Sequence, residues 1–133
     1  MKLRNTVIQQ QDATRIREIL ARFLGESGAD AALLIDRGGQ LLAMEGVSQA
    51  LDAVSISALA AAAFSSTAAM ARLLGEPEFS VLFHEGTKRS INVSTVDDEA
   101  ILLAIFDERT TVGMVRLFAS EASRAVEDRK SVV

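Results

Sequence analysis

The chain has 133 residues, of which 49% are hydrophobic and 24% charged, and it carries a formal net charge of −4 at pH 7. This size and composition are typical of one soluble globular domain, and the acidic balance argues against nucleic-acid binding, because neutralising phosphates requires a basic surface. The chain contains no cysteine, which excludes disulfides, thiolate metal sites and cysteine nucleophiles.

No segment resembles a targeting or membrane-spanning sequence. The amino-terminal stretch "MKLRNTVIQQQDATR" has no apolar run behind its basic residues, so we expect no signal peptide. The longest apolar runs are six or seven residues, whereas a membrane-spanning helix needs about 20. We therefore expect a cytoplasmic protein without membrane insertion, folded as a single domain over residues 1–133 with its core at about 14–126.

The first third of the chain predicts a helix followed by a hairpin. Apolar residues at one-face spacing predict a helix from about Gln10 to Gly25, with the glycine as its end. Two apolar runs, Ala31–Ile35 and Leu41–Met44, then flank the sequence "DRGG" of residues 36–39. This pattern is typical of two antiparallel strands joined by a turn with glycines at positive φ.

The central stretch of the chain predicts a long alanine-rich helix. It runs from about Asp52 to Leu74, where Gly75 provides a cap and Pro77 prevents continuation. Eight of the fifteen residues from Ser57 to Ala71 are alanine.

The last part of the chain predicts three strands and a helix. The strands are Phe79–Glu85, the alternating stretch "RSINVSTVD" at residues 89–97, and Ala100–Phe106, which is apolar on both faces. The final helix begins after "DERT" and has one apolar face, made of Val112, Val115, Phe118, Ala119, Ala122 and Val126.

The resulting order is α-β-β-α-β-β-β-α. Strands buried on both faces have continuous apolar runs, so Ala31–Ile35 and Ala100–Phe106 should be central and Phe79–Glu85 more peripheral. We predict a three-layer α+β domain, in which a five-stranded, mainly antiparallel sheet has helices on both faces.

The alanine-rich helix has one side with few large residues. Placed at 100° steps, its larger residues gather on one face, which we expect to pack on the sheet: Ile56, Leu59, Ala63, Thr67, Met70, Leu73 and Leu74. The opposite face is expected to carry small residues and one arginine: Ala58, Ala61, Ser65, Ala68 and Arg72, with Ala62 and Ala69 beside it. Water-exposed helix faces usually carry several charges. The small-residue face is therefore either an interface for another chain, or simply good helix-forming sequence covered by another part of this chain.

The strand Phe79–Glu85 has no residue that would protect a sheet edge. Its side chains alternate, with one set on each face: Phe79, Val81 and Phe83 against Ser80, Leu82 and His84. Proline, glycine and lysine, which usually blunt exposed edges, are absent from it. The strand therefore favours homodimerisation by edge pairing, which would place two alanine-rich helices side by side, unless a neighbouring element covers it.

The sequence contains no recognisable active site. His84 is the only histidine, too few for a metal site, and no nucleophile is available to form a triad with it. Asp97, Asp98 and Glu99 are consecutive, which suits a solvated turn, and no phosphate-binding loop or dinucleotide motif is present. We expect no cofactor, no metal and no catalysis by the chain alone.

Four segments together resemble the roadblock family of dynein-light-chain domains, and within it the bacterial MglB-type proteins. They are "AALLIDRGGQLLA", the helix ending "ARLLGEPEF", "FHEG" and "ILLAIFDERTTVGMVRL". The likeness extends from about Thr14 to Val126. It implies the roadblock fold, with homodimers or heterodimers formed by pairing of the third strands into one ten-stranded sheet. MglB-type proteins bind a small Ras-like GTPase of the MglA type and accelerate GTP hydrolysis.

The resemblance also implies which residues make contacts. The GTPase-binding positions would be Ala61, Ser65, Ala68, Ala69 and Arg72. The dimer interface would contain Phe79, Val81, Leu82, Phe83 and His84, together with Ala58 and Ala62. An activator can supply an arginine in trans, for which Arg72 and Arg109 are candidates, although such arginines are more often ordinary surface residues. The alternative is a dimeric scaffold that recruits partners without changing their chemistry.

Overall fold

The computed structural model describes residues 10–46 and 51–131, so the expectation about the first nine residues lies outside it. The described elements follow the predicted order: α1 (Gln10–Ser27), β1 (Ala31–Asp36), β2 (Leu41–Gly46), α2 (Ala53–Leu73), β3 (Val81–His84), β4 (Ser90–Thr95), β5 (Ala100–Phe106) and α3 (Val112–Ser131).

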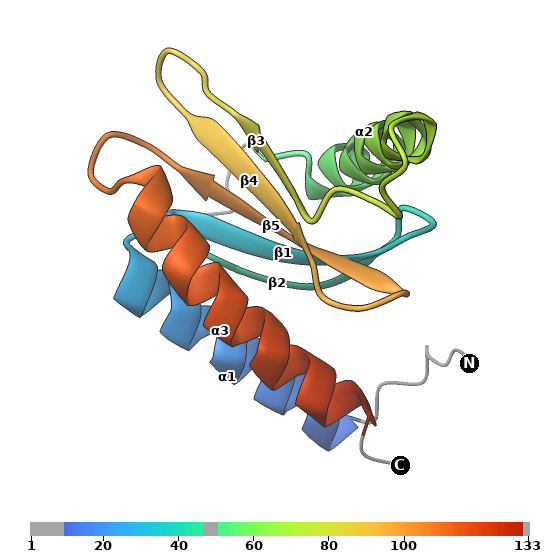
Figure 1. Cartoon of the computed structure of the whole chain (residues 1–133). Coiled ribbons are helices and arrows are strands. Elements are labelled where there is room, and N and C mark those ends of the chain that lie inside the picture. Colours follow the sequence, from blue (N-terminus) through green and yellow to red (C-terminus); the bar gives the residue numbers. More distant parts are fainter. Residues whose placement is uncertain (1–9, 47–50, 132–133) are drawn as a thin grey trace.

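The five strands form one antiparallel sheet in the order β2-β1-β5-β4-β3. The predicted placement of the strands is confirmed, because β1 and β5 are interior and β3 forms an edge (Figure 1). All residues of β5 are buried, as expected for a strand covered on both faces.

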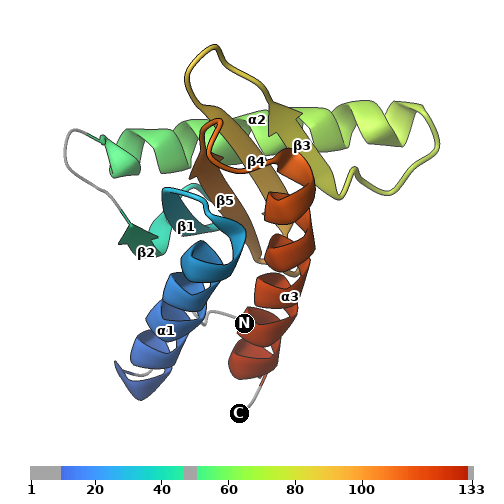
Figure 2. The same cartoon turned by 90° about the vertical axis from the view of Figure 1, so that its left-hand side faces the viewer.

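Helices cover both faces of the sheet, as predicted. Helices α1 and α3 lie side by side on one face, whereas α2 lies alone on the other face (Figures 1 and 2). Ile16, Leu20 and Phe23 of α1 and Val115 and Val126 of α3 are buried between these two helices, α1 and α3, and the sheet. The molecule therefore has three layers, and α2 is the outer layer on its side.

Two predicted element boundaries were wrong. Helix α1 does not end at Gly25 but continues to Ser27, and Gly28 adopts the positive φ of +80° that ends it, while its N–H donates to the Leu24 carbonyl. The third strand is shorter than Phe79–Glu85 and spans only Val81–His84. The predicted end of α2 is confirmed, since Gly75 has a φ of +86° and follows the last turn.

The predicted orientation of α2 was also wrong. The side facing the sheet contains mostly small residues around one aromatic ring: Ser57, Ala60, Ala61, Phe64 and Ala71 are buried. Leu59, Met70 and Leu73, which were expected on the sheet, are 70%, 53% and 87% exposed, and Leu74 is exposed as well. The helix is thus rotated by about a third of a turn from the predicted position.

The sheet itself explains this rotation. Leu33 and Ile35 of β1 and Ile101 and Leu103 of β5 point toward α2 and are fully buried. These large side chains already fill the space between the layers, so small residues on α2 allow the helix to approach closely. The alanines therefore partly serve contacts within the chain, as the second sequence interpretation allowed.

Gly39 in the β1–β2 turn shows how close this approach is. It has a φ of +102°, and a Cβ atom added there would lie 3.2 Å from Ala58 Cα and 3.8 Å from Ala61 Cβ. Gly39→Ala is therefore expected to reduce the free energy of unfolding by about 1–3 kcal/mol, from backbone strain and crowding of α2. Chemical denaturation measures the effect.

Gly25→Ala is the matched control for this substitution. Gly25 lies within α1, and apart from its chain neighbours and the α1 backbone no described heavy atom lies within 4 Å of the added Cβ. We expect it to raise the free energy of unfolding by about 0.5–1 kcal/mol, because alanine is the better helix former. Equal effects of the two substitutions would contradict the proposed crowding at Gly39.

Candidate interaction surface

The outward side of α2 carries several of the large hydrophobic residues that are exposed in the described part of the chain. Within α2, the residues on this side are all exposed, and we call them the α2 outer face: Leu59, Ala62, Ser66, Ala69, Met70 and Leu73. Val54 and Leu74, near the two ends of the helix, are exposed as well. A contiguous exposed apolar surface of this kind is typical of protein interaction sites.

The α2 outer face has no charged residue. Arg72 is the only charged residue between Ala53 and Leu73, and it forms no ion pair with the described residues. A long helix exposed to water would normally carry several Glu, Lys or Arg residues on its outer side. The composition therefore fits burial against another molecule better than permanent exposure.

The structure separates the predicted contact residues of α2 into two groups. Ser65, Ala69 and Arg72 are exposed, as are Ala58 and Ala62, whereas Ala68 is half-buried. The expectation that Ala61 faces outward is wrong: it is only 6% exposed and packs on the sheet. The sequence analysis grouped Leu59, Met70 and Leu73 on one apolar face but assigned that face to the sheet, so it did not name them as candidate contact residues, although they are exposed.

Strand β3 has an unpaired side. It pairs only with β4, so its other side is open in the described part of the chain. Thr95 N donates to Ser80 O at 3.2 Å, and hydrogen-bonded pairs alternate along an antiparallel ladder. The backbone groups of Leu82 and His84 therefore point to β4, whereas the N–H and C=O groups of Val81 and Phe83 point to the open side.

The side chains of β3 are held by the two layers of the protein. The Phe83 ring packs on the α1/α3 side, where it stacks with Phe106 at 6.1 Å between ring centroids. Leu82 packs on the α2 side. Both remain half-buried, like Val81, and His84 is exposed at the end of the strand. The β3 edge is therefore held in place by side-chain packing on both faces of the sheet.

Helix α2 and β3 lie near each other because the chain passes directly from one to the other. Figure 2 shows α2 crossing the strands, with its C-terminal end on the side of the sheet where β3 is the edge. The connection begins with a tight turn, in which Leu74 N and Glu76 N both donate to Ala71 O at 2.9 Å. The α2 outer face and the β3 edge are thus neighbouring parts of one side of the molecule.

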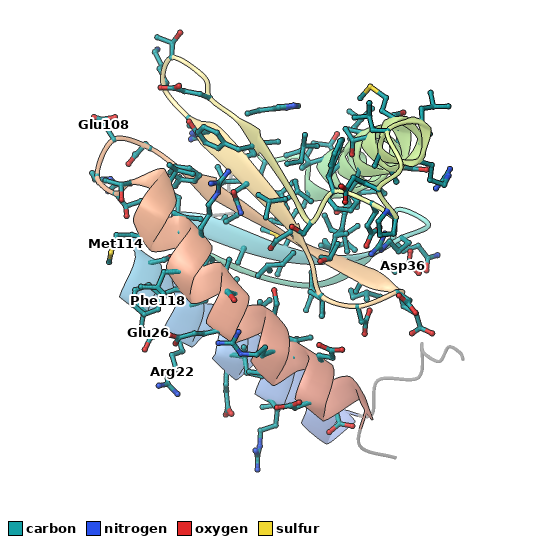
Figure 3. All side chains as sticks on the ribbon, in the orientation of Figure 1. Arg22, Glu26, Asp36, Glu108, Met114 and Phe118 are labelled. Atoms are coloured by element: carbon teal, nitrogen blue, oxygen red, sulfur yellow. The ribbon has the colours of Figure 1, made fainter. Side chains whose placement is uncertain are left out.

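Arg37 in the β1–β2 turn contacts the connection between α2 and β3. Its guanidinium donates two hydrogen bonds to Glu78, from Nη1 to Oε1 at 3.0 Å and from Nη2 to Oε2 at 3.3 Å. It lies over the Phe64 ring of α2, 5.4 Å from the centroid. Figure 3 labels the preceding residue, Asp36, at the end of the sheet below α2. No pattern in the sequence had indicated these contacts.

The N-terminal end of α2 is capped by Asp52. The Ser55 hydroxyl donates to Asp52 Oδ2 at 2.8 Å, and the Ser55 N–H donates to Oδ1 at 3.1 Å. These two hydrogen bonds lower the pKa of the Asp52 carboxyl below its usual range, despite a small opposing effect of burial. The cap is therefore strongest when this carboxylate is ionised, and its contribution to stability is lost as the pH falls through the lowered pKa.

Arg109 lies away from the α2 outer face. Its guanidinium contacts Asp30 at 2.5 Å and Asp107 at 3.1 Å, and the neighbouring Glu108 is labelled in Figure 3 at the opposite end of the sheet from α2. The hydrogen bond from Arg109 lowers the pKa of Asp107, and Asp107 in turn raises the pKa of Arg109. These contacts join the β5–α3 connection to the start of β1.

The described residues contain no group of three or more His, Cys, Asp or Glu side chains that could hold a metal ion. The predicted solvated turn at residues 97–99 is confirmed, since Asp97 accepts hydrogen bonds from the backbone N–H groups of Glu99 and Ala100.

By length and composition alone, α2 could cross a membrane. In this fold, however, one side of α2 packs on the sheet through Ser57, Ala60 and Phe64.

A profile of the Roadblock/LC7 domain matches residues 15–106, from α1 to the end of β5. No curated protein sequence matches the chain. Several solved structures do resemble it. MglB from Myxococcus xanthus is 34% identical, with 92% of each chain covered and a TM-score of 0.86.

Two further solved structures are similar to the same degree. The gliding protein MglB from Thermus thermophilus is 33% identical over 91% of this chain and 92% of that chain, with a TM-score of 0.85. A structure described as MglB with a tetrameric arrangement is 33% identical over 89% of each chain, with a TM-score of 0.84.

Proposed function

The chain belongs to the Roadblock/LC7 family, and from this membership we propose that it is a homodimeric, cytoplasmic regulator of a small Ras-like GTPase of the MglA type. The protein accelerates GTP hydrolysis by its partner and has no active site of its own. The observation that carries this proposal is the α2 outer face, an exposed and nearly uncharged surface beside an open sheet edge.

Two copies associate through their β3 edges. The outward N–H and C=O groups of Val81 and Phe83 pair with the same groups of the second copy, and a two-fold axis at Leu82 places each Val81 opposite the other Phe83. The two five-stranded sheets become one ten-stranded sheet, with both α2 helices on the same face. Ala58, Ala62 and His84 belong to this interface, and Phe79 lies beside it.

The GTPase binds on the side of the dimer that carries the two α2 helices. Ser65, Ala68, Ala69 and Arg72 are the proposed contacts from the family likeness, to which the structure adds the exposed Met70 and Leu73. Ala61 is omitted because it is buried. Burying a leucine that is otherwise exposed contributes about 1.5–3 kcal/mol, so these two apolar side chains would supply much of the affinity, and the small residues allow close approach.

The catalytic groups belong to the GTPase in this proposal. An activator either repositions the groups of the GTPase or inserts an arginine. Arg109 pairs with two carboxylates away from α2, which leaves Arg72 as the arginine on the proposed contact surface. The simpler mechanism is that the dimer rearranges the active-site loops of its partner.

Single-turnover GTP hydrolysis by an MglA-type GTPase tests this proposal. We expect a higher rate when this protein is added at saturating concentration, and tighter binding to the GTP form than to the GDP form. An unchanged rate, together with equal binding to both forms, would instead identify the protein as a scaffold. The hydrolysis assay is paired with sedimentation of the chain alone, which tests the dimer independently.

A further inference from the structure

Arg37 joins parts of the chain that are distant in sequence. Besides its two hydrogen bonds to Glu78, its Nη2 donates to Asp97 O at 2.8 Å, and its backbone N–H donates to Glu99 O at 2.8 Å. The β1–β2 turn is therefore attached both to the β4–β5 turn and to the segment just before β3. The position over the Phe64 ring adds α2 to the same cluster.

These contacts differ in geometry and burial from those of a fully exposed ion pair. The Arg37 side chain is 29% exposed and that of Glu78 34%, and the paired hydrogen bonds of a guanidinium to one carboxylate fix direction as well as distance. Lysine could not reproduce this geometry, because it presents a single ammonium group. The arrangement favours one orientation of the α2–β3 connection over others.

We propose that Arg37 is a positioning residue, which clamps the α2–β3 connection to the end of the sheet and so holds the α2 outer face and the β3 edge as one preorganised surface. Arg37 itself need not touch the second copy or the GTPase. The consequence for association rests on the proposed function, whereas the clamp can be measured in the isolated chain. Loss of the clamp leaves the surface residues in place but allows the connection to move, so that association must first order it.

The test compares Arg37→Met with Arg109→Met. Methionine keeps an unbranched side chain over Phe64 but removes the charge and all hydrogen bonds of the guanidinium. Arg109 also pairs with carboxylates, at the end of the sheet away from α2, so it is the matched control. Because the chain has no cysteine, a single Ser80→Cys substitution places a nitroxide label in the connection, where Ser80 is exposed.

Arg37→Met is expected to increase the mobility of the label at position 80 and to raise the dimer dissociation constant about tenfold, the factor for losing a charge-assisted hydrogen bond. Arg109→Met should change neither. Glu78→Gln, a milder variant that keeps the side-chain shape, should give a smaller effect in the same direction, and Arg37→Lys should restore only part of the association.

The two readouts separate this inference from the proposed function. A wild-type chain that stays monomeric and fails to bind the GTPase would contradict the proposed function and the predicted effect of Arg37 on dimerisation. The mobility of the label at position 80 would still test the clamp. If Arg37→Met leaves label mobility or the dissociation constant at the wild-type value, Arg37 is not a positioning residue. A double-mutant cycle of Arg37→Met and Glu78→Gln should show non-additive effects, and additive ones would contradict the pairing.

Discussion

Ala69→Arg is expected to weaken GTPase binding severely relative to the wild-type protein. Ala69 is exposed on the α2 outer face, where the proposed partner approaches a surface of small and apolar side chains. A long charged side chain at this position would both separate the two surfaces and lose its hydration on binding. The loss should amount to about 2–4 kcal/mol, or roughly 30- to 1000-fold in affinity.

The same substitution should leave the folded chain almost unchanged. Arginine is a good helix former, and exposed substitutions usually change the free energy of unfolding by about 0.5 kcal/mol or less. Ala21→Arg is the matched control, because Ala21 is exposed on α1 in the layer on the other side of the sheet. Titration calorimetry with the GTP-bound GTPase measures both variants, and equal affinities for the two would show that α2 is not the contact surface.

Val81→Pro is expected to convert the dimer into monomers. The N–H of Val81 points to the open side of β3, so proline removes a donor needed for pairing with a second copy while keeping the hydrogen bonds between β3 and β4. Proline is tolerated on edge strands for this reason and is one of the residues that blocks edge pairing. We expect the dimer dissociation constant to rise by about 100-fold or more, as for a hot-spot residue.

Val81→Thr serves as the control for the edge, because threonine keeps the N–H group and the β-branched shape. Sedimentation velocity across a concentration series should show a dimer for this variant and a monomer for Val81→Pro. Circular dichroism of both variants reports whether the domain remains folded. A Val81→Pro chain that is folded and still dimeric would exclude pairing through β3.

Most of the fold could be predicted from local patterns in the sequence. Continuous apolar runs identified β1 and β5 as interior strands, and helical spacing identified the buried face of α3. These patterns are informative because burial of one face of an element requires apolar residues at a regular spacing, and burial of both faces requires a continuous apolar run. The end of α1 was missed because Gly25 and Gly28 are both plausible stops, and only the second has a positive φ.

The interaction surface was harder to predict. The side of α2 that faces the sheet depends on how much space Leu33, Ile35, Ile101 and Leu103 leave between the layers, and this cannot be read from the helix alone. The pairing of Arg37 with Glu78 and Asp97 joins residues 41 and 60 positions apart. No spacing rule connects positions so distant, so only the assembled fold brings these contacts together.

The central pairing of the sheet has a consequence for how the chain acquires its structure. β1 pairs with β5 over its whole length, although the two strands come from opposite halves of the sequence. While the chain is being synthesised, β1 can pair only with β2, and its other edge stays open until residues 100–106 have emerged. The residues that pair are far apart along the chain, so we expect folding to be slower than in proteins with mainly local contacts, and exchange of β5 between nascent chains to be the characteristic failure.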